Sequence, residues 1–357
     1  MGDHYPTVRL AAAQASPVFL DRERSTEKAV ALIAEAAQQK AQLIAFGEAW
    51  LPGYPWWIYL GSPMYSAPFT QQLYANAVKI PSDTITQLCD AARENHIYVV
   101  MGLTELSGGS LYLAQITIAP SGELIGHRRK LKPTHAERTI WGEGDGSDLF
   151  VLPTDLGQVG SLNCWEHLQP LTRYAMNCFN EQIHIAAWPA FCLYTGTLYS
   201  FSGEASVAIS RSYALETQTF VIHVGGLCDQ ATLDLLADDD EKRTLLRVGG
   251  GISQVIDPNG ETIAGPLGDN EEGILIADCE MSKIPAAKMA NDPAGHYARA
   301  DVTQLLLNRR PRRPVVFKDP EFQSLAPERS PGNIAGDDDS AAVQQNEFSA
   351  EESEKNK

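Results

Sequence analysis

The sequence predicts an α/β protein built as a four-layer α-β-β-α sandwich, in which two sheets pack face to face and helices cover their outer faces. Two observations support this fold class. Short apolar strands alternate with helices along most of the chain, and the second half repeats the pattern of the first, down to the similar turns "IAPSGELI" and "IDPNGETI". No Pro/Gly/polar linker separates the halves, so we expect a single domain over residues 1–315, including a C-terminal assembly segment.

The first half begins with a βαβ unit, which implies a parallel pair of strands. A buried strand at 8–18 precedes a helix at 25–40, which opens at Ser25 and carries apolar residues at helical spacing; a second strand follows at 41–48. The next elements are a helix at 82–96, a strand at 97–105, and two strands joined by a Pro-Ser-Gly turn within 110–130.

The second half continues the same alternation of strands and helices. Residues 148–164 predict two strands joined by a Gly turn, and the elements after them are a helix at 168–180, a strand at 183–189, a helix at 204–217, a strand at 218–226, a hairpin at 250–266 and a final strand at 272–280. Two insertions, 59–75 and 228–246, are longer than this fold requires. They can govern assembly, or they can be mobile surface loops.

Composition and charge argue against several classes of partner. The formal net charge of −17 disfavours nucleic acids and anionic membranes. The chain lacks an apolar run long enough to span a membrane, and its N-terminus lacks the basic and apolar segments of a signal peptide, so we expect a cytoplasmic protein. Residues 316–357 are polar and acidic, which predicts a flexible tail.

The six cysteines predict free thiols. They form no CxxC motif, and their spacing fits neither a zinc site nor a compact disulfide framework. We therefore expect no metal and no cofactor.

Three reactive side chains stand at the ends of predicted strands, where sites form in parallel α/β sheets. Glu48 ends "LIAFGE", Lys130 ends "GELIGHRRK" and Cys164 ends "VGSLNC". A thiolate is a nucleophile, a carboxylate can take the thiol proton, and an ammonium can stabilise anionic charge. A helix starting just after Cys164 would favour the thiolate. Together these groups describe covalent attack on an unsaturated carbon bonded to nitrogen.

Simpler roles compete for each of the three residues. Cys164 can be a core filler, Glu48 can cap a helix, and Lys130 can belong to a solvated face in "HRRKLK". Lys132 lies two residues further on and competes for the role of Lys130. Because Pro133 suggests that the strand ends there, we retain Lys130.

The chain resembles the nitrilase branch of the nitrilase (carbon–nitrogen hydrolase) superfamily. The resemblance runs from about residue 8 to about residue 310. The stretches that carry it are "FGEAWLPGYPWW" (46–57), "RRKLKPTHAERTIWGEGDG" (128–146), "LNCWEHLQPL" (162–171) and "DPAGHYARAD" (292–301). The family fold is the same sandwich, and the "CWE" context is typical of nitrilases rather than amidases.

The resemblance implies a role for each matched residue. Cys164 is the nucleophile, Glu48 the general base and Lys130 the stabiliser of the intermediates. Glu137, in "THAER", matches a second glutamate that positions groups in the pocket. The implied chemistry is hydrolysis of a nitrile to a carboxylic acid and ammonia through a thioimidate and a thioester, without metal or cofactor.

Neighbouring polar residues have less defined roles. Glu166 fits an acid at a helix N-terminus. His135 and His167 flank the site, where a structural role is expected for each, and His135 is also a candidate for substrate contact. His296 fits a structural residue at a subunit contact, and Ala300 replaces the proline usual in the family.

Aromatic residues near the site indicate a hydrophobic substrate. Our candidates for substrate contact are Trp188, as a pocket wall, with Tyr54, Trp165 and His135. The aromatic stretches are most like those of arylacetonitrilases. The alternatives are a cyanide dihydratase or hydratase, an amidase of the same superfamily and a non-catalytic filament protein. The resemblance also implies a homo-oligomer built from dimers, which nitrilases often extend into spirals.

Overall fold

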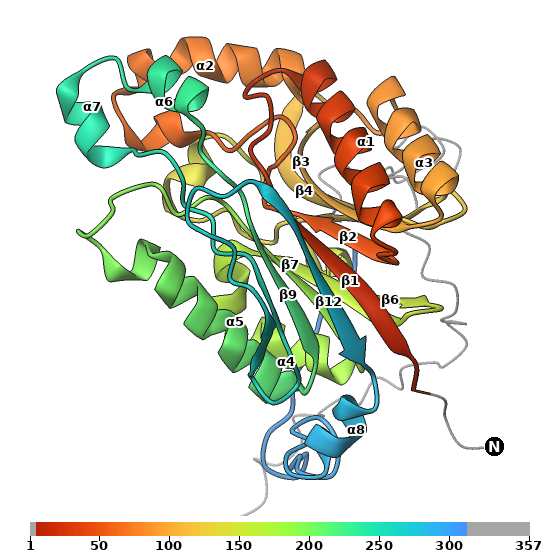
Figure 1. Cartoon of the computed structure of the whole chain (residues 1–357). Helices are drawn as coiled ribbons and strands as arrows, with labels where there is room; N and C mark the ends of the chain where they lie inside the picture. The colour runs from red at the N-terminus through yellow and green to blue at the C-terminus, as the bar shows by residue number, and fades with distance from the viewer. Residues whose placement is uncertain (1–4, 313–357) are drawn as a thin grey trace, which may run out of the picture.

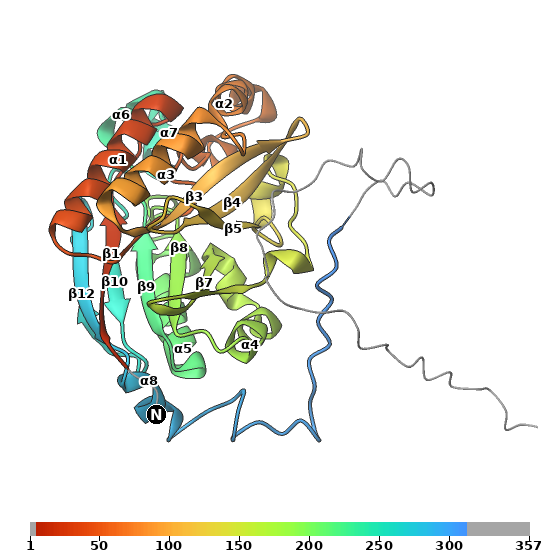
Figure 2. The same ribbon diagram turned by 90° about the vertical axis from the view of Figure 1, so that its right-hand side faces the viewer.

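The computed structural model describes residues 5–312, which form two six-stranded sheets packed face to face with helices on their outer faces (Figure 1, Figure 2). The strand orders are β12-β1-β2-β3-β4-β5 and β11-β10-β9-β8-β7-β6, so each half of the chain builds most of one sheet. This arrangement confirms the predicted four-layer sandwich. The predicted tail, 316–357, lies outside the described residues.

The first sheet has a parallel centre formed by β1, β2 and β3, and its other neighbours are antiparallel. The final strand, β12, returns to pair with β1. The strands are β1 (Thr7–Gln14), β2 (Leu43–Phe46), β3 (Tyr98–Ser107), β4 (Ser110–Ile118), β5 (Leu124–Arg129) and β12 (Gly273–Glu280), and the covering helices are α1 (Arg22–Gln38) and α3 (Asp83–Asn95).

The second sheet repeats the plan, with β7, β8 and β9 parallel at its centre. The strands are β6 (Val151–Thr154), β7 (Gly157–Asn163), β8 (Ile183–Trp188), β9 (Phe220–Gly225), β10 (Gln254–Ile256) and β11 (Thr262–Ala264). Helices α4 (Pro170–Cys178) and α5 (Gly203–Thr217) cover its outer face, and the short helix α8 (Lys283–Lys288) follows β12 (Figure 2).

Strand β1 shows how the sequence separates the layers. Successive side chains of a strand point to opposite faces. Ala11 and Ala13 pack with α1 and α3, whereas Leu10 and Ala12 pack between the sheets against β8 and β9. Both faces of this strand are buried, so it appears in the sequence as a continuous apolar run rather than an alternating one.

The predicted start of the first helix was wrong. Helix α1 begins at Arg22 because the Asp21 carboxylate caps it by accepting a hydrogen bond from the Arg24 N–H, while the Ser25 hydroxyl donates to the Val18 carbonyl. The two insertions, for which mobile surface loops were one alternative, are largely helical.

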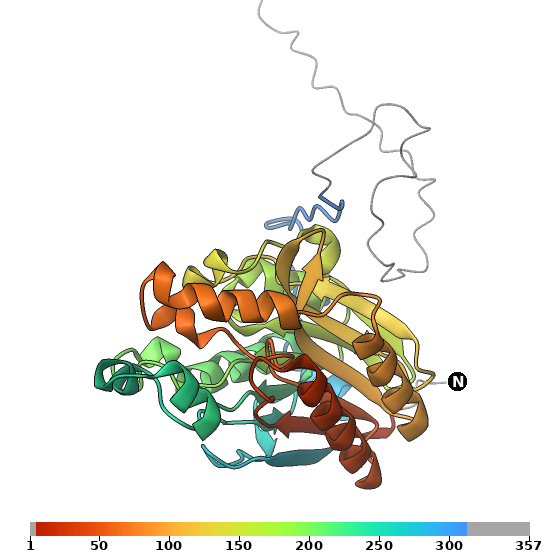
Figure 3. The same cartoon turned by 90° about the horizontal axis from the view of Figure 1, so that it is seen from above.

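The insertions form α2 (Pro63–Asn76), α6 (Gln230–Leu236) and α7 (Asp240–Leu245), which lie on the same side of the molecule (Figure 1, Figure 3). The Tyr65 hydroxyl donates to the Leu236 carbonyl, and the Lys242 ammonium lies 4.9 Å above the Tyr65 ring centre. The two insertions therefore pack against each other.

The two sheets approach each other closely just after β2. A Cβ added to Gly47 would lie 2.9 Å from both the Trp188 carbonyl oxygen and the Gly226 nitrogen, closer than real Cβ contacts allow. The next residue, Glu48, donates its backbone N–H to the same Trp188 carbonyl at 3.1 Å. The end of β2 is thus fixed directly against the ends of β8 and β9.

Gly47→Ala is expected to destabilise the fold by about 1–3 kcal/mol, because the added methyl group meets backbone atoms that cannot move aside. It should also lower activity by displacing Glu48. Urea unfolding measures the first effect and turnover the second. Gly273→Ala is the matched control, since a Cβ there meets nothing within 4 Å. Equal stability of the two variants would contradict the close approach.

Among residues 5–312, no helix is long and apolar enough to cross a membrane. All six cysteines are free thiols, as predicted.

His296 is exposed and its Nδ1 lies 3.5 Å from an Asp292 carboxylate oxygen.

Candidate active site

The structure brings Glu48, Lys130 and Glu137 together in a buried cluster. Lys130 follows β5 directly, and its Nζ donates to Glu48 Oε1 and to Glu137 Oε2, both at 2.8 Å. The Lys130 side chain is 0% exposed, so its ammonium forms hydrogen bonds with two carboxylates in place of water. Such a buried charge is stable only because it is paired on both sides.

Cys164 lies beside this cluster, at the end of β7. Its φ of 45° is a left-handed conformation that L-residues rarely adopt, and it turns the chain sharply from the strand into a 3₁₀ turn, Cys164–Leu168. The regular helix α4 begins only at Pro170, later than expected. The Trp165 backbone N–H lowers the pKa of Cys164 and so favours the thiolate.

Burial dominates the electrostatics of the thiol. It raises the pKa of Cys164 well above the usual value, and the Glu48 charge raises it further, whereas Lys130 and the Trp165 N–H lower it. Burial also raises the pKa of Glu48, to about 8, against the opposing effect of the Lys130 ammonium. The resting thiol therefore keeps its proton, and the expected helix effect does not produce a free thiolate.

Glu48 is equipped to receive that proton. Its Oε1 accepts from Lys130, while its Oε2 is buried and has no hydrogen-bond partner within the described part of the chain. A buried, unpartnered carboxylate oxygen is costly in a structure that serves stability alone. An oxygen in this state is available to a proton from Cys164 or from a water molecule.

Glu137 holds the other side of Lys130. Its Oε1 accepts from the Tyr54 hydroxyl at 2.7 Å, and its Oε2 also accepts from the Thr134 backbone N–H at 2.6 Å. Tyr54 is almost fully buried, and its hydroxyl also lies 3.2 Å from the Tyr59 hydroxyl. Tyr54 therefore orients the Glu137 carboxylate, which limits what its hydroxyl can offer to a substrate.

Glu166 ties the strand ends of the site together. Its carboxylate accepts from the Arg128 guanidinium at 2.7 Å, from the Leu131 N–H at 2.8 Å and from the Asn163 N–H at 2.7 Å. Leu131 is next to Lys130, and Asn163 is next to Cys164. One buried carboxylate thus sets the distance between the lysine and the thiol.

Sequence reasoning missed this bridge. "HRRKLK" suggests a solvated face, yet Arg128 is 2% exposed. The alternation of side chains along β5 offered a signal, because it places Arg128 on the same face as the buried Lys130.

Two basic residues near the site face solvent. Lys132 is exposed and pairs with Glu143, so Lys130 is the lysine within the cluster. His135 is also exposed, and its ring stacks parallel to that of Tyr59 with 6.4 Å between ring centres. His135 therefore lies at the solvent-exposed edge of the site and contacts Tyr59, whose hydroxyl lies next to that of Tyr54.

The two tryptophans expected at the substrate have different environments. Trp165 is half-buried, and its ring centre lies 5.3 Å from that of Phe201. Trp188 is fully buried: it stacks on His167 at 5.2 Å, and its indole N–H donates to the Ser210 hydroxyl at 3.2 Å. Trp188 supports neighbouring rings and is not part of the cavity wall described next.

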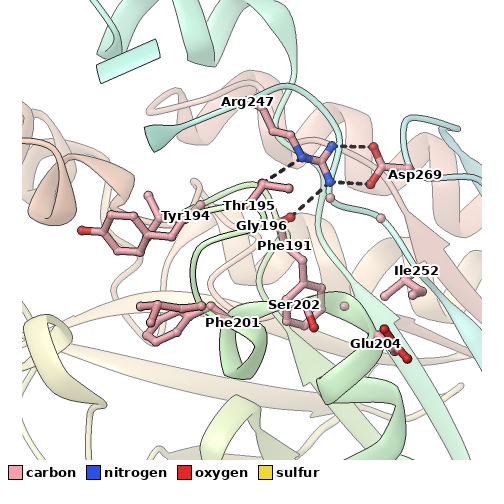
Figure 4. A pocket seen from close by; sticks show the side chains of 15 residues that line it. Phe191, Tyr194, Thr195, Gly196, Phe201, Ser202, Glu204, Arg247, Ile252 and Asp269 are labelled. Carbon is pink, nitrogen blue, oxygen red and sulfur yellow. Dashed lines mark hydrogen bonds and ion pairs between the residues drawn. The ribbon is translucent and has the colours of Figure 1, made fainter. Parts of the chain in front are cut away.

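A cavity of about 140 Å³ opens beside these rings (Figure 4). One side is polar: the Arg247 guanidinium forms two hydrogen bonds with the Asp269 carboxylate, at 2.5 and 2.7 Å. The opposite side carries the apolar side chains of Phe191, Tyr194, Phe201 and Ile252, together with Ser202 and Glu204. Phe191 packs against Trp188 at 5.8 Å and Phe201 against Trp165, which connects the cavity to the residues that follow Cys164.

Comparison with known proteins places the chain in a family. The carbon–nitrogen hydrolase family matches residues 9–289, and the chain belongs to this family. A nitrilase of Pseudomonas syringae is 45% identical over 87% of this chain and 92% of its own length. An aliphatic nitrilase of Rhodococcus rhodochrous is 44% identical (88% and 86%), and an arylacetone-specific nitrilase of Alcaligenes faecalis is 43% identical (90% and 91%).

Solved structures support the fold. Saccharomyces cerevisiae Nit3, a member of branch 10 of the nitrilase superfamily, superposes with a TM-score of 0.64 at 20% identity. The match covers 82% of this chain and 96% of that chain. The sandwich is therefore the fold of the nitrilase superfamily, as the sequence resemblance implied.

Proposed function

We propose that this protein is a nitrilase that hydrolyses a hydrophobic nitrile, such as an arylacetonitrile, to a carboxylic acid and ammonia. The observation that carries the proposal is the dry cluster in which Lys130 is held between two carboxylates beside Cys164, with one Glu48 oxygen unpartnered. The names of the relatives, nitrilases at 38–45% identity, support the same activity.

The first half of the reaction forms a thioester. Glu48 takes the Cys164 proton as the sulfur attacks the nitrile carbon, and the nitrile nitrogen receives that proton, which gives a thioimidate. Water adds to this carbon with Glu48 as base. Glu48 returns this proton to the nitrogen and then carries the hydroxyl proton of the intermediate to it as well. The C–N bond breaks, ammonia leaves and the thioester remains. Lys130 stabilises the negative charge that develops in each addition.

The second half releases the product. Glu48 takes a proton from a second water, which adds to the thioester carbonyl. The C–S bond breaks, the acid departs and Cys164 recovers a proton from Glu48. In total one nitrile and two waters give one acid and one ammonia. Early C–S cleavage in the first tetrahedral intermediate would instead release an amide.

The cavity beside Trp165 suits the organic part of the substrate. Phe191, Phe201 and Ile252 offer an apolar surface, and aromatic rings favour stacking with an aryl group. Relatives named for aliphatic and for arylacetone-specific activity are about equally similar to this chain. We favour the aryl substrate because of these rings. A cyanide-degrading enzyme, an amidase and a non-catalytic filament protein remain the alternatives.

The test is release of ammonia and acid from phenylacetonitrile, an aliphatic dinitrile, cyanide and phenylacetamide. Acid from phenylacetonitrile supports the proposal. Turnover of cyanide alone would assign the protein to the cyanide-degrading class, and turnover of the amide alone to the amidases. Absence of all four activities in folded protein would favour the filament protein.

The proposal extends to assembly and location. We propose a cytoplasmic homo-oligomer built from dimers that extends into a spiral. Sedimentation of the active enzyme should show species larger than the 39.0 kDa chain. A purely monomeric profile would contradict this part of the proposal.

Phe201→Ala is expected to lower kcat/KM for phenylacetonitrile about 3- to 10-fold, since an aromatic contact contributes about 0.5–1.5 kcal/mol. The same change should leave a short aliphatic nitrile almost unaffected, which makes that substrate the internal control. Steady-state kinetics on both nitriles measure the difference. Equal losses of kcat/KM on the two nitriles would show that this cavity does not bind the substrate.

The kcat/KM of the wild type is expected to rise with pH through the pKa of Glu48, which is about 8. Below that pH Glu48 holds a proton and cannot accept the one from Cys164, so the active fraction falls about tenfold per pH unit. A pH–rate profile in buffers of constant ionic strength measures this limb. A flat profile from about pH 5 to about pH 8 would exclude Glu48 as the base.

A further inference from the structure

A continuous chain of buried hydrogen bonds leads from the backbone of Cys164, along the outer face of the second sheet, to Tyr213 of helix α5. The Cys164 carbonyl is 2.6 Å from His167 Nδ1, and His167 Nε2 is 2.8 Å from His184 Nε2. His184 Nδ1 is 2.7 Å from Glu181 Oε1, and the Tyr213 hydroxyl donates to Glu181 Oε2 at 2.5 Å. His167, His184, Glu181 and Tyr213 are all at most 1% exposed.

The carbonyl at one end fixes the direction of every bond between neutral groups. A carbonyl only accepts, so His167 Nδ1 carries a hydrogen and donates to it. His167 Nε2 then accepts, and His184 Nε2 is the donor. His184 Nδ1 is left as an acceptor, and Glu181 must be a neutral carboxylic acid that donates to it. The orientation of this chain therefore depends on one proton held by Glu181.

The surroundings favour that neutral state. Burial raises the pKa of Glu181 to about 8 and lowers the pKa of His184 well below its usual value. Arg128 also opposes a charge on His184, while Glu166 favours it.

Other charged groups face the two ends of the chain. Arg173 and Glu216 act on Tyr213 with opposite signs. At the other end, Glu48, Lys130 and Glu137 face Cys164.

The end of this chain is the peptide unit that serves the nucleophile. The C=O of Cys164 and the N–H of Trp165 belong to one peptide group: the carbonyl accepts from His167, and the N–H lowers the pKa of the Cys164 thiol. A hydrogen bond to the carbonyl polarises the peptide and strengthens donation by its N–H. It also holds Cys164 in its left-handed conformation, with φ of 45°.

We infer that Glu181, as a neutral acid, acts through His184 and His167 to orient and polarise the 164–165 peptide, and so promotes attack by Cys164. Glu181, His184 and His167 are positioning residues, because only the peptide at the end of the chain meets the reacting sulfur. The inference rests on the proposed function for the identity of the nucleophile. It adds a requirement for one specific proton outside the reacting cluster.

Two substitutions at Glu181 separate this role from simple packing. Glu181→Gln keeps the shape, donates to His184 from its amide N–H and accepts from Tyr213 with its amide oxygen. Glu181→Met has a similar volume and neither donates nor accepts strongly. If the proton on Glu181 orients the chain, glutamine should replace the acid and methionine should not.

The first readout needs no nitrile. Alkylation of Cys164 by iodoacetamide is followed by peptide mass spectrometry over a range of pH, with exposed Cys178 as the reference in the same sample. Loss of one neutral hydrogen bond corresponds to roughly a tenfold change. We expect Glu181→Met to slow alkylation of Cys164 about tenfold and to move its pH profile upward, with Cys178 unchanged. Glu181→Gln should stay within about threefold of the wild type.

The second readout is turnover of phenylacetonitrile. Glu181→Met should lower kcat about 10- to 100-fold and change KM little, since the polarised N–H acts on charge that develops during reaction. Glu181→Gln should recover most of kcat. Circular dichroism and thermal unfolding establish that each variant is folded.

Three results would overturn the inference. A folded Glu181→Met enzyme with wild-type alkylation and kcat would show that the chain only fills space. A Glu181→Gln enzyme as impaired as Glu181→Met would show that a charged carboxylate is needed. If Glu181→Met does not fold, His184→Phe interrupts the chain between Glu181 and His167 and retains a ring that can stack on Tyr213, and unchanged Cys164 alkylation in that variant would decide against the inference.

The two readouts also distinguish this inference from the proposed function. Absence of nitrile turnover in the wild type, with the alkylation contrast intact, would reject the nitrilase activity and keep the positioning role. Normal nitrile turnover, with equal Cys164 alkylation in Glu181→Met and Glu181→Gln, would keep the nitrilase activity and reject the positioning role.

Discussion

Cys164→Ala is expected to abolish acid and ammonia release from phenylacetonitrile, with a loss in kcat on the order of 10⁴-fold or more. The thiol is the only group in the cluster able to form the covalent bond on which the later steps depend. Glu48 and Lys130 remain in the variant, but they have no attacking atom to activate. Removal of one sulfur atom from a 7% exposed side chain should leave the fold intact.

Cys178→Ala is the matched control, because Cys178 is an exposed cysteine within α4. It should retain full activity. Mass spectrometry adds a second measurement: wild type quenched during turnover should carry a substrate-derived acyl mass on the Cys164 peptide, and Cys164→Ala should not. Residual activity above about 1% in Cys164→Ala, free of wild-type enzyme, would be incompatible with a nucleophilic role.

The sequence predicted most of the fold because its strongest signals are local. Buried strands such as β2 and β8 are short apolar runs, and α3 starts at its capping residue Ser82. The ends of these elements were less predictable. Asp21 and Ser25 are both good capping residues, and only packing in three dimensions selects Asp21. The helical insertions likewise pack against each other, and a local sequence pattern does not show such a contact.

The site was predictable as a set of residues but not as a set of bonds. Strand ends pointed to Glu48, Lys130 and Cys164, and the structure places these side chains in and beside one cluster. The contacts that fix their geometry join segments far apart in the chain. Glu166 reaches Arg128 across 38 positions. The sequence suggested an acid at a helix N-terminus for Glu166 and a solvated face for Arg128. The sequence pattern likewise did not predict that Trp188 is fully buried against His167.

Lys130→Met is expected to have the second largest effect, and it should reduce both kcat and stability. The ammonium stabilises each developing negative charge, and loss of one such group in a dry site costs on the order of 10²–10³-fold in kcat. It also separates two buried carboxylates, Glu48 and Glu137, that would otherwise face each other unpaired. Breaking a buried pair in this way costs about 3–5 kcal/mol in the free energy of unfolding.

The stability loss should depend on pH in a definite direction. Without the ammonium, burial raises the pKa of Glu48 further above its unfolded value, so the folded variant binds more protons than the unfolded chain. A group with a raised folded pKa contributes its stability below the unfolded pKa and loses it as the pH rises. The difference in melting temperature between variant and wild type should therefore change little up to about pH 8, because Glu48 keeps its proton in both folded proteins there, and should grow above that pH.

Lys132→Met provides the control that isolates position from charge. It removes an equal charge two residues away, but Lys132 is exposed and its pairing with Glu143 is screened by water. Its melting temperature and kcat should match those of the wild type at every pH. If both variants lost stability equally, the effect would follow net charge. If only Lys130→Met does, with a loss that grows as the pH rises, the buried ammonium is what allows two carboxylates to share a site with a thiol.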